Sequence, residues 1–254
     1  MIGKIAPAAA IARSVSLYWG GAARRAALDR WYARFLGPGD LAFDVGAHVG
    51  DRTASFLRLG ARVVALEPQP ALARFLRARF GRRADVSVVA AAAGARPGRI
   101  LLHVNEANPT VSTASAAFLR AADGAAGWEG QVWSRRIPVR VTTVEALAAR
   151  FGTPSFVKID VEGFEAEVLA GLRRRIAALS FEFTTIQRDV AQAAIARLEA
   201  MGYRFFNASL GESLRFAMPG PVGPRMIRSW IGSLPAEANS GDVYASLTPL
   251  PLCG

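Results

Sequence analysis

The chain has 254 residues, of which 52% are hydrophobic, and it carries a formal net charge of +11. This length allows one α/β domain with a sizeable core, and the composition excludes a disordered chain. The single cysteine, Cys253, excludes an intramolecular disulfide and a cysteine-based metal site, so we expect a reducing, cytoplasmic environment. No apolar run reaches the ~18 residues of a membrane-spanning helix, and no clear signal-peptide cleavage site is found.

The first predicted element is an amphipathic helix over residues 22–36, which Gly37-Pro38-Gly39 ends. Its apolar residues recur at helical spacing: Leu28, Trp31, Tyr32, Phe35 and Leu36. Such a helix usually packs against its own domain, although a basic amphipathic helix can also lie on a membrane. We assign residues 1–36 to an N-terminal helical extension and residues 37–254 to the main domain, with peripheral membrane contact through the extension as an alternative.

Strands and helices then alternate along the main domain. Helices are expected at about 50–59, 70–80, 144–151, 163–171 and 191–201. Strands are expected at 41–45, 62–66, 86–90, 100–104, 137–142, 155–160, 179–183, 203–207 and 243–247. This alternation predicts a doubly wound, Rossmann-like, mostly parallel sheet. Residues 105–135 and 208–240 fit it poorly, and such long loops are usually functional or disordered, so either could border an active site.

A glycine turn follows the first strand, from Asp44 to Gly50. Gly46 would let the backbone approach a ligand, and Gly50 would let the following helix pack closely. The dinucleotide fingerprint G-x-G-x-x-G is absent, and Asp44 would repel a pyrophosphate at this turn. A cationic ligand, such as the sulfonium and amino acid end of S-adenosylmethionine, tolerates an acid there.

Glu67 ends the second strand, where a carboxylate can accept hydrogen bonds from both hydroxyls of a ribose. NAD enzymes use the same device, and a cap on the next helix is the structural alternative. An adenine ring is expected beside the end of the third strand, near residues 90–94, where Ala92 and its small neighbours permit close approach.

A second strand-end turn carries Asp160 and Glu162, whose side chains point the same way if the extended geometry persists. These acids could act as a general base, bind a cation or hold a polyol by its hydroxyls. Lys158 has the same parity and could pair with either acid. We favour Glu162 as the cap of the following helix and Asp160 as the functional group. Glu182, an acid in an apolar strand, is either directed at the site or held by a structural hydrogen bond.

The only histidines are His48, in the first turn, and His103, expected on the polar face of a strand. His48 could serve as a base, although we favour a role in shaping the turn. Two histidines without a nearby cysteine are no metal signature, so no metal ligands are assigned. A G-x-S-x-G nucleophile elbow and a G-x-x-x-x-G-K-[ST] phosphate loop are both absent from the sequence.

The two turns together resemble the FkbM-type family of S-adenosylmethionine-dependent methyltransferases. The resemblance covers about residues 37–185 and keeps the order of the motifs, which are residues 43–50, 65–68, 139–147 and 158–171. It implies a class I methyltransferase fold, with Asp160 and Glu162 at the reaction centre. With Glu182 added, these are the predicted catalytic residues. The predicted cofactor-binding residues are Asp44, Gly46, Ala47, His48, Gly50, Thr53, Glu67, Pro68 and Ala92.

Three positions depart from the pattern of this family. His48 replaces the usual asparagine, Ala95 stands where an acid is frequent, and Phe183-Thr184 lacks the histidine sometimes found after the equivalent of Glu182. The first of these departures could alter the contacts with the cofactor. The family implies O-methylation of a hydroxyl, frequently on a sugar or a natural product, and it does not name the acceptor.

The leading hypothesis is in-line methyl transfer from S-adenosylmethionine to a hydroxyl of a sugar, glycan or natural-product acceptor, with Asp160 first and Glu162 second as proton acceptor. A divalent cation at these acids is a less favoured alternative. The charge of +11 leaves open an RNA methyltransferase, although scattered arginines without interleaved aromatics disfavour nucleic acid. A non-catalytic, membrane-associated cofactor-binding protein is a third interpretation, and an NAD oxidoreductase fits least.

Overall fold

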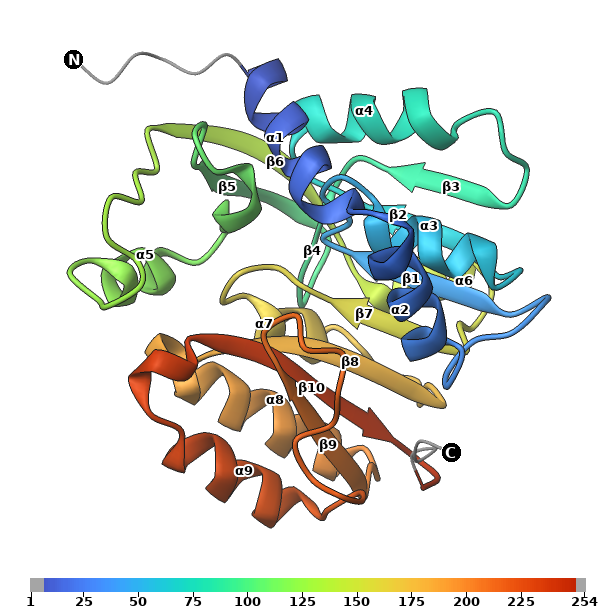
Figure 1. Ribbon diagram of the computed structural model, residues 1–254, viewed down its shortest axis with the longest axis vertical. Coiled ribbons are helices and arrows are strands. Elements are labelled where there is room, and N and C mark those ends of the chain that lie inside the picture. The colour runs from blue at the N-terminus through green and yellow to red at the C-terminus, as the bar shows by residue number, and fades with distance from the viewer. Residues whose placement is uncertain (1–6, 250–254) are drawn as a thin grey trace.

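The computed structural model describes residues 7–249, which form a seven-stranded sheet with helices on both faces and a small second sheet beside it (Figure 1). The strand order of the large sheet is β3-β2-β1-β7-β8-β10-β9. Its strands are β1 (Leu41–Val45), β2 (Arg62–Leu66), β3 (Val86–Val89), β7 (Phe156–Ile159), β8 (Ala178–Thr184), β9 (Phe205–Leu210) and β10 (Ser240–Ser246).

Five of these strands, β3, β2, β1, β7 and β8, pair in parallel, and β10 runs antiparallel between β8 and β9. The prediction of a doubly wound, mostly parallel sheet is therefore confirmed. The chain winds outward from β1 to β3 and then returns to place β7 on the other side of β1. This reversal leaves a crevice at the carboxyl ends of β1 and β7, where ligands bind in open α/β sheets. The register sets Asp44 beside Lys158.

The expected helices of the main domain are present, with ends that differ from the predictions by a few residues. They are α3 (Asp51–Arg58), α4 (Pro70–Phe80), α6 (Val144–Phe151), α7 (Glu165–Ala170) and α8 (Arg188–Ala200). The central strands are buried on both faces, as parallel strands covered by helices must be, and Phe43, Val45, Ile159 and Phe181 are at most 1% exposed. This core fixes the two strand ends that carry Asp44 and Asp160.

Two N-terminal helices, α1 (Pro7–Trp19) and α2 (Ala22–Tyr32), precede the sheet. The apolar face predicted for the second helix is buried, with Leu28, Trp31 and Tyr32 at most 1% exposed, and Trp31 Nε1 donates to the Tyr244 hydroxyl at 2.8 Å. This helix ends at Tyr32 rather than at residue 36. The first helix was not predicted as a separate element. Within residues 7–249, no helix is long and apolar enough to cross a membrane.

The small sheet has the order β4-β6-β5, with β4 (Ala92–Ala93), β5 (Gly98–Val104) and β6 (Arg135–Thr142). The strands expected at 100–104 and 137–142 belong to it and not to the large sheet. The two stretches expected to be long loops contain helices. Residues 105–135 include the 3-10 helix η1 (Pro109–Val111) and α5 (Ala116–Ala122), and residues 208–240 include α9 (Pro224–Ser233), which buries Ile227 and Ile231.

Candidate active site

A pocket opens at the carboxyl ends of the parallel strands, with about 980 Å³ of empty space counting its open mouth. Its wall brings together all but two of the predicted site residues: Asp44, Gly46, Ala47, His48, Glu67, Pro68, Ala92, Asp160, Glu162 and Glu182. The other two, Gly50 and Thr53, are not part of the wall and lie behind it. The sequence-based grouping of two distant turns into one site therefore agrees with the geometry.

The two turns touch each other through their backbones at Gly46. This residue has a φ of +87°, and a Cβ added to it would lie 1.7 Å from the Asp160 carbonyl oxygen. The Asp160 N–H in turn donates to the Val45 carbonyl at 2.9 Å. The need for glycine here thus arises from the second turn, whereas the sequence-based argument attributed it to a ligand.

Asp44 lies at the floor of the pocket, where it is almost fully buried and is held by one side chain. Thr53 Oγ1 donates to Asp44 Oδ2 at 2.5 Å, and the two side chains are 0% and 3% exposed. Burial raises the pKa of Asp44 to about 6. Thr53 therefore acts on the pocket through Asp44 and not by direct contact. A Cβ on Gly50, the N-cap of α3, would collide with Leu76 and Phe80 of α4, so this glycine lets the start of α3 pack closely against α4, as expected.

The carboxylate of Glu67 holds both the first turn and the segment that follows β2. It accepts hydrogen bonds from the His48 N–H at 2.9 Å and from the Gln69 N–H at 2.8 Å. Burial raises the pKa of Glu67 to about 8. Gln69 is the N-cap of α4, so the carboxylate fixes the approach to this helix while it also faces the pocket.

His48 adopts a left-handed backbone conformation with a φ of +49°, which His, Asn and Asp occupy more readily than most residues. Its ring meets that of Tyr18 edge-on with centroids 5.4 Å apart, and its Nε2 lies 3.4 Å from Thr110 Oγ1. Burial lowers the pKa of His48 to about 4, so the ring is neutral at pH 7. These contacts suit a residue that shapes the turn. His103 lies in β5, outside the pocket wall.

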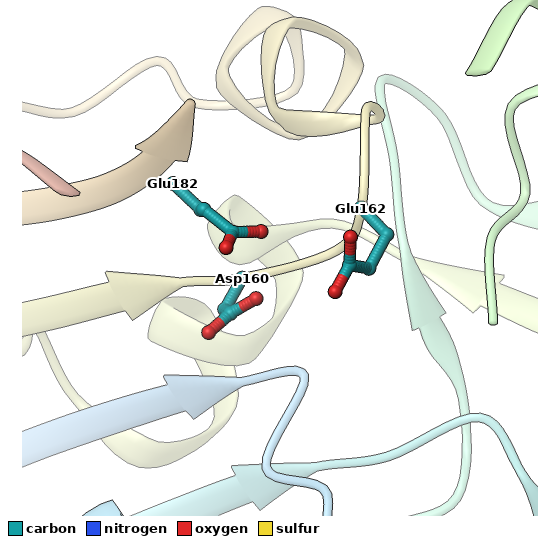
Figure 2. Close-up of side chains that lie close together, drawn as sticks. All are labelled: Asp160, Glu162 and Glu182. Atoms are coloured by element: carbon teal, nitrogen blue, oxygen red, sulfur yellow. The ribbon is translucent and has the colours of Figure 1, made fainter. Parts of the chain in front are cut away.

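The second turn gathers three carboxylates (Figure 2). Asp160 follows β7, Glu162 lies two residues further on, and Glu182 comes from the neighbouring strand β8. One oxygen of each lies within 4.8 Å of the others. Glu162 has a φ of +57°, so the extended geometry assumed for the turn ends before this residue. The side chains nevertheless converge on one space at the pocket wall.

Lys158 lies beneath this cluster of carboxylates and is 2% exposed. Its Nζ donates to Asp160 Oδ2 at 2.9 Å and to Asp242 Oδ1 at 3.1 Å, so of the two acids with which it could pair, Asp160 and Glu162, it pairs with Asp160. Burial alone would raise the pKa of Asp160, but the adjacent Lys158 ammonium outweighs it and lowers that pKa. Burial, together with repulsion by Asp160, raises the pKa values of Glu162 and Glu182. One ionised acid thus lies beside two acids that hold protons more tightly.

The prediction that Glu162 caps the following helix is wrong. Glu165 performs this kind of role, because its Oε1 accepts from the Val161 N–H at 3.0 Å and from the Gly163 N–H at 3.3 Å. Both donors belong to the turn, so Glu165 fixes the turn from behind while burial raises its pKa to about 7. The left-handed conformation of Glu162 directs its side chain to the pocket instead.

Sequence reasoning missed several residues of the pocket wall. Tyr18 comes from α1, Thr110 and Ser112 come from residues 105–135, and Glu212 comes from residues 208–240. The sequence leaves open whether either long stretch borders the site, and both contribute residues to the pocket wall. Arg52 donates to the two carboxylate oxygens of Glu212 at 2.6 and 2.7 Å. A sequence signal for α1 is the i, i+4, i+8 spacing of Ala10 and Ser14, which are buried, and Tyr18, which lines the pocket.

The charge of the pocket is opposite to that of the whole chain. Two cationic residues, Arg52 and Lys158, face seven carboxylic acids: Asp44, Asp51, Glu67, Asp160, Glu162, Glu182 and Glu212. A wall of this composition favours cationic ligands and repels phosphate groups. The net charge of +11 therefore resides elsewhere on the molecule.

The sheet order, the switch point between β1 and β7 and the pocket above it define a Rossmann-like fold of the class I methyltransferase type. The family model for the methyltransferase FkbM domain matches residues 44–205. The chain therefore belongs to the FkbM methyltransferase family. A comparison with curated proteins finds no match.

Several solved structures are similar to the chain at low identity. A precorrin-6y C5,15-methyltransferase from Geobacter metallireducens has 14% identity and a TM-score of 0.43, with 88% of this chain and 87% of that chain covered. A TehB-like SAM-dependent methyltransferase from Corynebacterium glutamicum has 12% identity and a TM-score of 0.45, with coverages of 87% and 86%. Fibrillarin from Aeropyrum pernix, solved with S-adenosyl-L-methionine, has 12% identity and a TM-score of 0.42, with coverages of 82% and 67%.

Proposed function

We propose that the protein transfers a methyl group from S-adenosylmethionine to a hydroxyl of a sugar, glycan or natural-product acceptor. The observation that supports this most directly is the carboxylate cluster of Asp160, Glu162 and Glu182, which shares one pocket with Glu67 and the Asp44 turn. Carboxylates are strong acceptors for hydroxyl groups, and a grouped set of them suits an acceptor that carries several hydroxyls.

The pocket residues fit the proposed cofactor. Each oxygen of Glu67 accepts one backbone N–H and keeps a free lone pair, so the fixed carboxylate can accept hydrogen bonds from ribose hydroxyls. The small side chains of Ala91, Ala92 and Ala93 leave room for a flat ring. The anionic wall, with Asp44 below it, suits an ammonium and a sulfonium group. When bound, S-adenosylmethionine supplies an electrophilic methyl group at this wall.

Asp160 would receive the proton of the acceptor hydroxyl. Because Lys158 keeps the pKa of Asp160 low, this carboxylate is ionised at neutral pH and available to accept. Glu162 and Glu182, whose pKa values are raised, would hold other hydroxyls and orient the acceptor. Proton transfer to a positioned group contributes roughly 10²–10⁴-fold in rate, and orientation of the reacting atoms contributes further.

The test is methyl transfer from isotope-labelled S-adenosylmethionine to a panel of polyhydroxylated acceptors, followed by mass spectrometry. Asp160→Asn should lower turnover by about 10²–10⁴-fold and leave cofactor affinity within about threefold of the wild type. Asp85→Asn, which removes a half-exposed carboxylate paired with Arg83 far from the pocket, is the matched control. Full activity in Asp160→Asn would exclude Asp160 from the reaction.

RNA is the second acceptor class, and only the net charge of +11 favours it. The seven carboxylic acids of the pocket wall argue against a phosphodiester entering it. RNA binding with a steep salt dependence, together with methylated RNA in the same assay, would support this alternative. Co-sedimentation with anionic liposomes tests the non-catalytic membrane alternative, for which the buried apolar face of α2 provides no surface.

A further inference from the structure

The cluster of Asp160, Glu162 and Glu182 has the geometry of a cation site. Two ligands of one cation cannot be further apart than twice the metal–oxygen bond, which is roughly 4–5 Å for Mg²⁺ or Ca²⁺. One oxygen from each of the three carboxylates lies within 4.8 Å of the others, which meets the Ca²⁺ end of this range. Mg²⁺, at the shorter end, would draw the oxygens together by roughly a few tenths of an ångström. Figure 2 shows the side chains entering one space from the end of β7, from the turn and from β8.

Two of these carboxylates have buried oxygens without a hydrogen-bond donor among the described residues. Glu162 is 6% exposed, and among residues 7–249 no donor forms a hydrogen bond with its side chain. The Oε2 atom of Glu182 is inaccessible to solvent and also has no hydrogen-bond partner in the described chain. Buried carboxylates are normally paired or bind metals, so both side chains retain oxygens that can bind a ligand.

The charges around the cluster lead to the same conclusion. Lys158 already donates to Asp160 Oδ2 and to Asp242, so one ammonium serves four carboxyl groups when Glu162 and Glu182 are included. The other pocket cation, Arg52, is bound to Asp51 and Glu212. The lysine leaves Asp160 Oδ1 free, and this oxygen can face a cation beside the other two carboxylates.

We infer that Asp160, Glu162 and Glu182 bind a divalent cation with a preference for hard oxygen ligands, such as Mg²⁺, Mn²⁺ or Ca²⁺. The ligand set contains only carboxylates, which suit these ions, and the pocket beside it leaves room for water or an acceptor hydroxyl in the remaining positions. This departs from the sequence-based preference for no metal. The inference rests on the proposed function only in placing the acceptor hydroxyl at the cluster, where the cation would lower the hydroxyl pKa.

Cation binding can be measured on the full chain without cofactor or acceptor. Protein treated with a chelator and dialysed is titrated with Mn²⁺, and free Mn²⁺ is counted by electron paramagnetic resonance. One ion should bind per chain with a Kd below about 1 mM, and Mg²⁺ should compete. Glu182→Gln and Glu162→Gln should each weaken Mn²⁺ binding by about tenfold or more. Glu67→Gln, which removes a carboxylate from the same pocket outside the cluster, should change it by less than about threefold.

Circular dichroism and thermal denaturation establish that each variant is folded. Absence of Mn²⁺ binding by the wild-type chain would overturn the inference, and so would Mn²⁺ affinities of Glu182→Gln and Glu162→Gln equal to that of the wild type. A proton shared between Asp160 and Glu182 would then be the alternative that stabilises the cluster. Methyl transfer that persists in the chelator-treated protein would overturn the role of the cation and leave the proposed function intact. Mn²⁺ binding without any methyl transfer to hydroxyls would overturn the proposed function and leave the cation site intact.

Discussion

The two glycine turns of the pocket differ in how their acids are satisfied. In the first turn, Asp44 accepts from Thr53, and Glu67, which follows β2 and holds this turn, accepts a backbone N–H with each oxygen. In the second turn, Asp160 is paired with Lys158, whereas the Glu162 side chain and one oxygen of Glu182, from the adjacent strand β8, have no hydrogen-bond partner within the described residues. The acids of the first turn have their hydrogen-bond donors within the protein, whereas two acids at the second turn still have unpaired oxygens.

This difference indicates a division of roles. A carboxylate fixed by two backbone donors is preorganised to hold a ligand in one orientation. Carboxylates that repel one another are costly in the empty pocket, and the cost is recovered when a hydroxyl, a proton or a cation joins them. We therefore expect changes in the first turn to affect cofactor affinity and changes in the second to affect turnover. The following predictions test this division, from the largest expected effect to the smallest.

Gly46→Ala should disrupt the close backbone contact between Gly46 and Asp160, which joins the two turns. Its Cβ would lie 1.7 Å from the Asp160 carbonyl oxygen, so the free energy of unfolding should fall by more than about 4 kcal/mol, with loss of cofactor binding. Gly39→Ala is a matched control, because Gly39 has nearly the same φ, +86°, and nothing within 4 Å of an added Cβ. This control should cost only about 1–2 kcal/mol. Chemical denaturation measures both, and equal costs would show that the clash is relieved.

Glu67→Gln should reduce the affinity for S-adenosylmethionine by about 10–100-fold, because hydrogen bonds to a charged group are lost. In the wild type, burial raises the pKa of Glu67 to about 8, and ribose hydroxyls favour the ionised form. Binding must therefore release a proton below this pH, so affinity should rise with pH up to about 8 and then level off. Calorimetry from pH 6 to 9 should show a flatter profile in the variant. If the affinity of the variant depends on pH as steeply as that of the wild type, another group is responsible for the proton release.

Thr53→Val should act on the cofactor through Asp44, since Thr53 does not contact the pocket. Loss of the hydrogen bond raises the pKa of Asp44 above its present value of about 6 and costs about 1–2 kcal/mol in stability at neutral pH. Thr53→Ser retains the hydroxyl and should keep the wild-type pH profile of cofactor binding. If Thr53→Ser behaves like Thr53→Val, packing of the threonine methyl group accounts for the effect.

Tyr18→Ala should raise the KM for cofactor or acceptor by about fivefold, which corresponds to roughly 1 kcal/mol of contact with the pocket wall. Leu17→Ala, at a neighbouring position whose side chain is 65% exposed, should leave KM unchanged. Steady-state kinetics of the two variants compares them directly. Equal KM values would mean that Tyr18 contributes no part of the binding surface.

Much of the fold and of the wall of the site could be predicted from the sequence. Apolar strands that end in an acid and a glycine, such as residues 41–46, give a strong local signal, and parallel strands bring such ends to one edge. The same signal located Glu67, Asp160 and Glu162 at the pocket. Glu182 was found because an acid in an apolar strand is unusual.

The remaining features depend on contacts that a local pattern does not encode. The left-handed conformation of Glu162 directs its side chain to the pocket, and Glu165 holds the backbone of the turn instead. Nothing in the residue types distinguishes the two acids. Tyr18 and Glu212 reach the pocket from opposite ends of the chain through tertiary packing. The steric demand on Gly46 comes from Asp160, a residue far away in the sequence, and it became visible only in the three-dimensional structure.

The contact between Gly46 and Asp160 also bears on how the molecule is assembled. The floor of the pocket cannot exist until residues 156–160 have paired with β1, and this pairing closes a long loop. During synthesis, the first turn is therefore made well before its partner, and it lacks its contact with Asp160 until the intervening helices and the small sheet have been synthesised. The pocket is thus a product of the completed chain, and a slow step in pairing β7 with β1 would delay activity rather than secondary structure.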